Sequence, residues 1–144
     1  MNTFFGIALE TFVVLALVAA NGFFVAAEFA LVKVRASQLR PLAKTGGWRV
    51  KFALMALDRL DAALSATQLG ITLASLGLGW VGEPFVAHRI TPLLARWGIT
   101  DPTTVHSIAF VVAFVSITFL HIVFGEQGPK MLAIQRAKPV TLWT

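Results

Sequence analysis

Three apolar stretches dominate the chain, and each is long enough to cross a membrane as a helix. They cover about residues 4–32, 62–81 and 103–125. A bilayer core about 30 Å thick requires roughly 20 mostly apolar residues in a helix. The pattern therefore predicts an all-α membrane protein with three transmembrane helices.

The connection between the first two stretches, residues 33–61, is basic and carries its own helical pattern. Trp48, Phe52 and Met55 recur at helical spacing with cationic residues between them. This alternation is typical of an amphipathic helix that lies in the membrane interface. We therefore expect a cytoplasmic juxtamembrane helix in this segment.

The connection between the second and third stretches, residues 82–102, is expected to be an outer loop. It begins with Gly82-Glu83-Pro84 and ends with Asp101-Pro102. Proline beside glycine or aspartate is a strong turn signal. The sequence thus predicts a turn at each end of this loop.

Basic residues are distributed unevenly between the connections, which predicts the orientation. Residues 33–59 contain seven Lys and Arg residues and Asp58 as the one acid, and the residues after Glu126 contain bases without an acid. Short cytoplasmic loops are enriched in Lys and Arg. We expect the N-terminus outside the plasma (inner) membrane and the C-terminus in the cytoplasm.

Composition supports a membrane domain and argues against an enzyme. Only 13% of the 144 residues are charged, against about 25% in a typical soluble domain. Cysteine is absent, which excludes disulfides and thiolate metal sites, and no nucleophile elbow, phosphate loop or HExxH motif occurs. The net charge of +5 comes from bases at membrane edges, which predicts contact with the lipid bilayer rather than nucleic acid.

Polar residues inside the first two spans are arranged on defined helix faces. Asn21 and Glu28 share one face of the first span. The second span carries a polar sector beside a ridge of small residues. The sector contains Ser65, Gln68, Thr72, Ser75 and Gly79, and the ridge contains Ala62, Ala66, Gly70 and Ala74. Polar side chains at such positions either join helices or face a ligand, and small residues allow helices to approach closely.

The third span ends in the most specific local signal, Gly125-Glu126-Gln127-Gly128-Pro129-Lys130. Pro129 has no N–H, so the carbonyl of Gly125 loses its helical donor. A carboxylate beside unpaired carbonyls at a helix break is a cation-binding arrangement in transporters. The alternative is a helix that simply stops at a proline near the interface. For His121 we expect a helix–helix hydrogen bond.

Hydroxyl, amide, carbonyl and carboxylate oxygens form the whole candidate set of ligands. Such a set suits hard cations such as Mg²⁺ or Ca²⁺, whereas zinc and copper prefer imidazole or sulfur.

Three motifs together resemble the CorC/cyclin-M group of magnesium transporters, whose bacterial members are often labelled hemolysin-related. They are Asn21-Gly-Phe-Phe-Val-Ala-Ala-Glu28, the segment Leu64–Trp80 followed by Gly82-Glu-Pro84, and Gly125-Glu-Gln-Gly-Pro-Lys130. The resemblance extends from about residue 10 to the end of the chain.

The resemblance implies a single transmembrane domain, residues 1–144, that forms a homodimer and binds Mg²⁺ in a cavity open to the cytoplasm. It also implies Mg²⁺ export, coupled to Na⁺ influx, and regulatory CBS domains that follow the membrane domain and are absent from this chain. The positions that match the family's ion site are Asn21, Ser65, Thr67, Gln68 and Glu126. The carbonyl of Gly125 and the carboxylate of Glu28 complete the expected metal site.

Two functions are compatible with these patterns. One is transport of a divalent cation, most plausibly Mg²⁺. The other is a membrane anchor and dimerisation module without transport, which the small-residue ridge would support. This alternative is favoured by Val25, Ala26 and Ala27, which occupy positions where many relatives carry serines.

Overall fold

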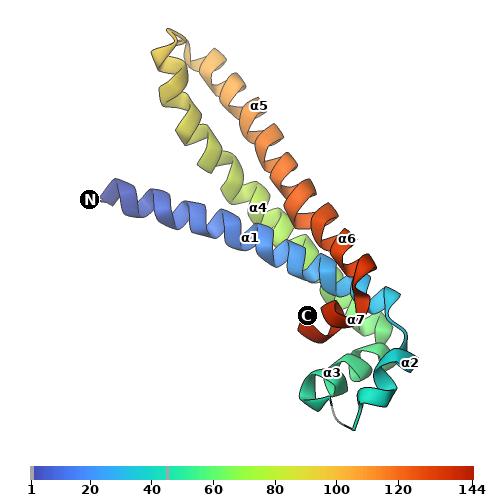
Figure 1. Cartoon of the computed structure of the whole chain (residues 1–144). Helices are drawn as coiled ribbons and strands as arrows, with labels where there is room; N and C mark the ends of the chain where they lie inside the picture. Colours follow the sequence, from blue (N-terminus) through green and yellow to red (C-terminus); the bar gives the residue numbers. More distant parts are fainter. Residues whose placement is uncertain (1, 45) are drawn as a thin grey trace.

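The computed structural model describes residues 2–44 and 46–144, with side chains from residue 5 onward. Within these residues the chain is helical, without a strand (Figure 1). The elements are α1 (Asn2–Lys33), α2 (Ala36–Leu39), a 3₁₀ turn (Arg40–Leu42), α3 (Gly47–Asp58), α4 (Leu60–Arg96), α5 (Pro102–Leu120), a π-helical segment η2 (His121–Gln127), α6 (Gly128–Gln135) and α7 (Ala137–Trp143).

Three segments are long and apolar enough to cross a membrane, and they confirm the predicted fold class. They are Phe5–Lys33, Leu60–Arg96 and Pro102–Gln135. The third is built from α5, η2 and α6, which follow one another in a continuous rod (Figure 1). Helices α4 and α5 form a hairpin, and the C-terminal half of α1 lies against the open end of that hairpin.

The expected turn at Gly82-Glu83-Pro84 is wrong, because α4 continues through it to Arg96 with Pro84 and Pro92 inside the helix. A proline removes one helical hydrogen bond but keeps a helical φ, so a long helix can absorb it. The chain instead reverses around Gly98, whose φ of +80° is in the left-handed region that favours glycine. Asp101 then caps α5, its side chain accepting from the Thr104 N–H.

The small-residue ridge of α4 has two different environments. Ala74 is buried and Gly70 lies against the ring of Phe24 from α1, where a Cβ on residue 70 would approach the ring to 2.6 Å. Ala62 and Ala66 are exposed and line an apolar groove between α4, α1 and α3. Half of the ridge therefore joins α4 to α1, and the other half remains uncovered in the single chain.

The predicted juxtamembrane helix is present as α3, which packs against α2, α4 and α7. Val50 and Ala53 form its buried side and pack in one cluster with Val34 and Leu39. Trp48, Phe52 and Met55 are exposed on the opposite side. An exposed apolar face next to cationic residues is the pattern of a helix that lies in the interface.

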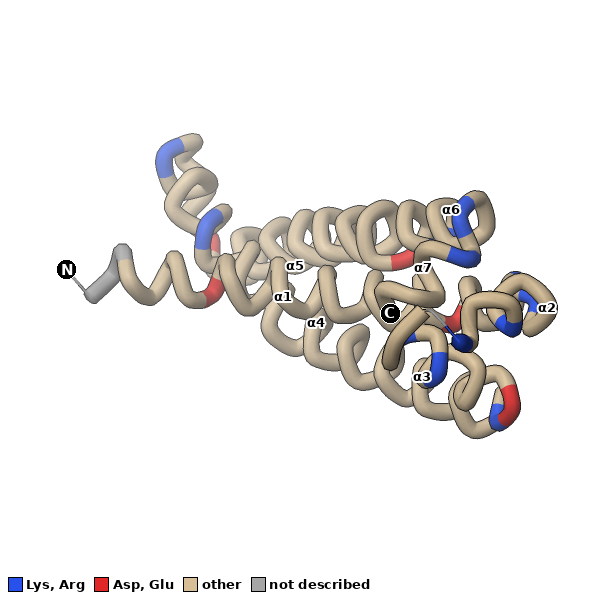
Figure 2. Tube along the Cα trace, turned by 60° about the horizontal axis from the view of Figure 1, so that its bottom comes forward, with Lys and Arg blue, Asp and Glu red and all other residues tan. Residues whose placement is uncertain are grey.

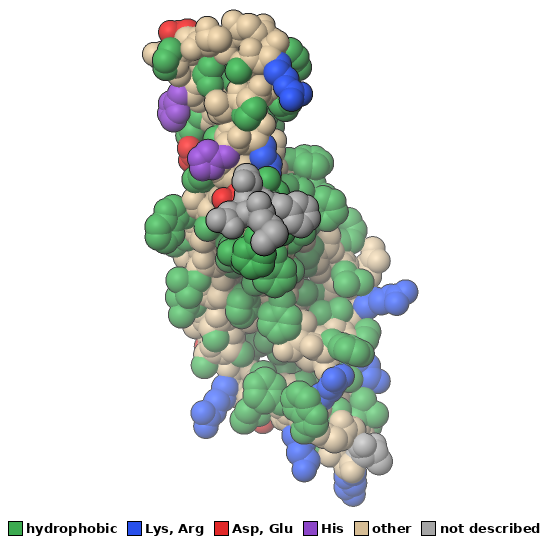
Figure 3. Space-filling model, turned by 90° about the vertical axis from the view of Figure 1, so that its left-hand side faces the viewer, with side chains coloured by type: hydrophobic (Ala, Val, Ile, Leu, Met, Phe, Trp, Pro, Cys, Tyr) green, Lys and Arg blue, Asp and Glu red, His purple; other side chains and the backbone are tan. Residues whose placement is uncertain are grey.

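Charged side chains mark the two ends of the molecule. The middle of the long helices is almost free of Lys, Arg, Asp and Glu (Figure 2). Hydrophobic side chains form a band across the middle, and Lys and Arg gather near the end formed by α2 and α3 (Figure 3). We refer to this end as the basic end and to the end at the α4–α5 turn as the distal end.

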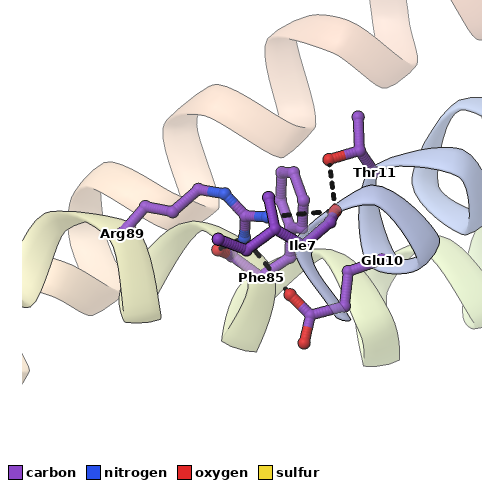
Figure 4. Close-up of polar contacts among 5 residues, drawn as sticks. All are labelled: Ile7, Glu10, Thr11, Phe85 and Arg89. Atoms are coloured by element: carbon purple, nitrogen blue, oxygen red, sulfur yellow. Dashed lines mark hydrogen bonds and ion pairs between the residues drawn. The ribbon is translucent and has the colours of Figure 1, made fainter. Parts of the chain in front are cut away.

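Towards the distal end, Arg89 fastens α4 to α1 (Figure 4). Its guanidinium donates to the carbonyl of Phe85 at 2.6 Å and to Oε2 of Glu10 at 3.4 Å, and it lies over the Phe85 ring. Its Nη2 also reaches the carbonyl of Ile7 at 3.5 Å. One side chain thus joins the two helices by an ion pair and by backbone contacts.

Candidate cation-binding site

Three spans meet at a chain of hydrogen bonds between buried or half-buried polar groups. Asn21 of α1 is fully buried, and its Nδ2 donates to the carbonyl oxygen of Gly125 in η2 at 2.9 Å. Ser75 of α4 donates to Oδ1 of Asn21 at 3.1 Å. The same hydroxyl lies 3.2 Å from Nε2 of His121 in η2. We call Gly125, Asn21, Ser75 and His121 the central layer.

The directions of these hydrogen bonds follow from chemistry. The carbonyl of Gly125 can only accept, so the amide nitrogen of Asn21 must face it and the amide oxygen must face Ser75. The single hydroxyl proton of Ser75 goes to that oxygen. The Ser75 oxygen can then accept from Nε2 of His121 in the tautomer that carries a proton on Nε2.

A cavity of about 280 Å³ adjoins the central layer on the side of the basic end. Glu28 from α1 and Glu126 from η2 are its two carboxylates, and Ser75 and Asn21 supply a hydroxyl and an amide. Its remaining lining residues are Val25, Phe29, Ile71 and His121. Both carboxylates are half-buried. We refer to this space as the inner cavity.

Gln68 extends the polar set at the edge of the inner cavity. Its Nε2 donates to Oε1 of Glu28 at 3.3 Å, which joins α4 to α1 a second time. An ionised carboxylate has about four lone-pair positions. Glu28 therefore keeps acceptor capacity after it has bound Gln68.

The π-helical segment explains how Gly125 reaches Asn21. Pro129 cannot donate to the carbonyl of Gly125, and the helix responds by widening over His121–Gln127 rather than by breaking. The carbonyl is not left unpaired as the sequence suggested, because Asn21 donates to it. Glycine at position 125 also suits this close approach, since a Cβ there would make a tight contact of 3.1 Å with Nδ2 of Asn21.

The structure brings together Asn21, Glu28, Gly125 and Glu126, with Gln68 beside them, but not Ser65 and Thr67. The Ser65 hydroxyl is exposed and donates to the carbonyl of Asp61 in its own helix. The Thr67 hydroxyl donates to the carbonyl of Leu64, and Thr67 lines the apolar groove. Neither residue lines the inner cavity.

Two residues of the inner cavity were not among the expected ligands. Ser75 belongs to the polar sector of the second span, one turn beyond Thr72, and this sector was the signal that could have identified it. The predicted helix–helix hydrogen bond of His121 is confirmed by its contact with Ser75. Its spacing of four residues from Gly125 places it on the same helix face.

Of Val25, Ala26 and Ala27, only Val25 lines the inner cavity. Ala26 packs with Ala30 and Ala133, and Ala27 faces the apolar groove. The inner cavity therefore receives an apolar side chain from this part of α1.

The donor set of the inner cavity is suited to a hard cation. Within residues 2–44 and 46–144, no group of three or more His, Cys, Asp or Glu side chains is close enough to hold a metal by itself. Any bound ion must therefore use neutral oxygens as well as the two carboxylates. Mg²⁺ and Ca²⁺ take such mixed oxygen ligands and often retain water.

Comparison with known proteins decides the family. Residues 12–144 match the family described as the cyclin M transmembrane N-terminal domain. The chain belongs to this family. It is an integral membrane domain, as the three spans also indicate.

Among curated cyclin M relatives, the UPF0053 protein YugS of Bacillus subtilis is 45% identical over 94% of this chain, and the UPF0053 protein YhdT of the same organism is 47% identical over 88%. The UPF0053 protein MT1890 of Mycobacterium tuberculosis is 42% identical over 85%. The aligned regions are 31%, 27% and 27% of these relatives' own lengths. The chain therefore corresponds to less than a third of each of these proteins.

Proposed function

We propose that this cyclin M domain binds a divalent cation in the inner cavity and transports it across the membrane, with Mg²⁺ as the preferred ion. The observation that carries the proposal is the convergence of Glu28 and Glu126 on one cavity whose lining also includes Asn21 and Ser75. Carboxylates inside a membrane domain are costly and usually functional. Two of them in one cavity would repel each other, and a bound cation would remove that repulsion.

The size of the cavity supports an ion that keeps part of its water. At roughly 30 Å³ per water molecule, six waters occupy about 180 Å³, and the cavity volume is about 280 Å³. Mg²⁺ loses its water reluctantly and is commonly bound by one or two carboxylates. A partly hydrated Mg²⁺ held by Glu126 and Glu28, with Asn21 and Ser75 as neutral ligands, satisfies both conditions.

The basic end supports an orientation in which the inner cavity opens towards the cytoplasm. Lys and Arg side chains gather there (Figure 3), and cytoplasmic segments carry this excess in membrane proteins. In this orientation Mg²⁺ from the cytoplasm would enter between Glu28 and Glu126, and export coupled to Na⁺ influx is the direction that we propose.

Binding can be tested by calorimetric titration of the purified domain with MgCl₂. We expect saturable binding that Glu126→Gln abolishes and Ser75→Ala weakens. Ser65→Ala is the matched control, because Ser65 lies on the same helix but bonds only within it. Equal Mg²⁺ affinity in the Glu126→Gln variant would refute the site. Proteoliposome flux, with and without an opposing Na⁺ gradient, tests export and its coupling.

A second candidate function, a dimerising membrane anchor without transport, is favoured by the exposed half of the small-residue ridge. Ala62 and Ala66 offer a close-packing surface to a second copy. Ala62→Leu and Ala66→Leu would then weaken the homodimer, as measured by cross-linking in membranes. A dimeric domain that binds no Mg²⁺ and carries no flux would favour the anchor over the transporter.

A further inference from the structure

A second space, of about 440 Å³, lies between α4 and α5 on the distal side of the central layer. We call it the outer hollow. Its polar lining consists of Ser75, Glu83, Thr118 and His121. The apolar part of the lining is formed by Leu78, Phe110, Ala113, Phe114 and Ile117, with Gly79 between them.

The outer hollow and the inner cavity share Ser75 and His121. These two residues are 3.2 Å apart and are joined to Asn21 and Gly125 in the central layer. One thin set of hydrogen-bonded side chains therefore separates the two spaces. A polar wall with space on both sides has the form of a barrier within a pathway.

Glu83 gives the outer hollow a carboxylate at its distal part. It follows Ser75 by eight residues, which is about 12 Å along α4. Gly79 lies between them, and a Cβ there would meet nothing within 4 Å, so the helix surface between Ser75 and Glu83 is open. A carboxylate on an apolar span is expensive unless it faces water or an ion.

The opposite side of α4 is fastened to α1 at the same end. Arg89 bonds to Glu10 and to the backbone of Phe85 and Ile7 (Figure 4). The outer hollow lies instead on the side of α4 that faces α5. A route from the central layer to the distal end would therefore follow the α4–α5 side.

We propose that the outer hollow is the distal half of a hydrated divalent cation's pathway, with Glu83 as its distal ligand and the His121–Ser75–Asn21 contacts as the barrier between the two halves. This inference rests on the proposed transport function. Passage of an ion requires Ser75 to exchange its partners, because the same hydroxyl closes both spaces.

Cysteine accessibility tests the pathway directly, because the natural chain has no cysteine. Single variants Thr118→Cys and Gly79→Cys place a thiol in the outer hollow, and Val25→Cys places one in the inner cavity. Phe119→Cys is the matched control, since Phe119 is next to Thr118 in the sequence and is 61% exposed but does not line the hollow. A membrane-impermeant cationic thiol reagent is added to one side of proteoliposomes at a time.

We expect Thr118→Cys and Gly79→Cys to react about tenfold or more faster than Phe119→Cys, because the reactive thiolate forms only where water enters. They should react from the side opposite to that which modifies Val25→Cys. Equal rates for Thr118→Cys, Gly79→Cys and Phe119→Cys would overturn the pathway, and so would modification of all cavity positions from one side. Because Thr118→Cys and Gly79→Cys both place a thiol in the outer hollow, the test still holds if one of the two variants does not fold.

Failure of this inference and failure of the proposed function give different results. If Mg²⁺ binds to the parent domain but both outer variants are inert, the inner site stands and the outer pathway is wrong. If the outer variants react but the parent domain binds no Mg²⁺, the hollow is a water-filled space and not a cation pathway. As a further check, Glu83→Gln should lower Mg²⁺ flux severalfold, whereas Glu10→Gln, on the α1 side of the same end, should not.

Discussion

The side-chain amide of Asn21 occupies the place of a missing backbone donor to Gly125. Its Nδ2 lies 2.9 Å from the Gly125 carbonyl oxygen, whose partner in a regular helix would be the N–H of residue 129. Residue 129 is a proline, so that donor does not exist. A side chain from the first span therefore completes the backbone of the third, 104 residues away.

Replacement of Asn21 by leucine should destabilise the domain by about 1–3 kcal/mol, because a buried carbonyl is left without a donor. Leucine has the same number and branching of side-chain heavy atoms as asparagine, so no cavity is created. The midpoint of unfolding in mixed micelles during an SDS titration measures this effect. Interhelical hydrogen bonds in membranes average only about 0.6 kcal/mol, so a value near the upper limit would exceed that of one such bond and reflect the buried groups left without partners, the Gly125 carbonyl and the Ser75 hydroxyl.

Thr72→Val provides the control for this measurement. The Thr72 hydroxyl is exposed and donates to the carbonyl of Gln68 in its own helix. Its removal leaves no buried group without a partner, so we expect almost no change in stability. An equal loss in both variants would mean that the Asn21–Gly125 contact has no special role.

The three spans could be predicted because the bilayer imposes a length and a polarity on each crossing helix. Their distal ends could not, because a proline residue by itself does not show whether it lies inside a helix or at a turn. Pro84 and Pro92 lie within α4, while Pro102 begins α5. The difference is that Asp101 caps the following helix and Gly98 supplies the left-handed turn.

The candidate site could be predicted only in part, because helical spacing shows which residues share one face of a helix but not which residues of another helix that face contacts. Asn21, Glu28 and Glu126 all line the inner cavity. Ser65 and Ser75 belong to the same polar sector, yet only Ser75 lies opposite Asn21. The crossing point of α1 and α4 decides between them, and that point depends on tertiary packing.

Gly22 and Gly79 should respond in opposite ways to alanine. A Cβ on Gly22 would lie 2.9 Å from the Pro129 ring and 3.3 Å from the carbonyl of Phe124, neither of which can rotate away. We expect Gly22→Ala to cost about 1–3 kcal/mol of stability through overpacking. Gly79→Ala meets open space and should gain up to about 1 kcal/mol from helix propensity. The same SDS titration compares them, and a stable Gly22→Ala variant would contradict the close approach of α1 to α6.

Removal of the Arg89 guanidinium should loosen the distal part of α1 without unfolding the domain. The Glu10 ion pair is partly exposed, with 32% and 47% of the two side chains accessible, and such pairs contribute about 0–1 kcal/mol. Arg89→Gln should therefore leave the unfolding midpoint nearly unchanged but accelerate amide hydrogen exchange around Ile7 and Thr11. Arg96→Gln, on the last turn of the same helix, is the control. Unchanged exchange in Arg89→Gln would show that the contacts of Figure 4 do not restrain α1.

The cap of α5 at Asp101 should depend on pH in a defined direction. The Thr104 hydroxyl and the Thr104 N–H donate to its carboxylate at 2.7 and 2.8 Å, and these hydrogen bonds hold the pKa of Asp101 below its usual range. The stabilisation is therefore fully present above the usual Asp pKa of about 3.9 and is lost as the pH falls through the lowered folded value.

At neutral pH, Asp101→Ala should speed amide exchange at Thr104 and Val105, because the first turn of α5 loses its cap. Asp101→Asn keeps an oxygen acceptor but cannot titrate. After correction for the intrinsic effect of pH on exchange, protection of the Thr104 amide should therefore stay constant in this variant over the pH range in which the natural chain loses it. A natural chain that keeps full protection of Thr104 well below the lowered pKa would contradict a charge-assisted cap. The helix would then be started by Pro102 alone, whose fixed φ suits the first helical position.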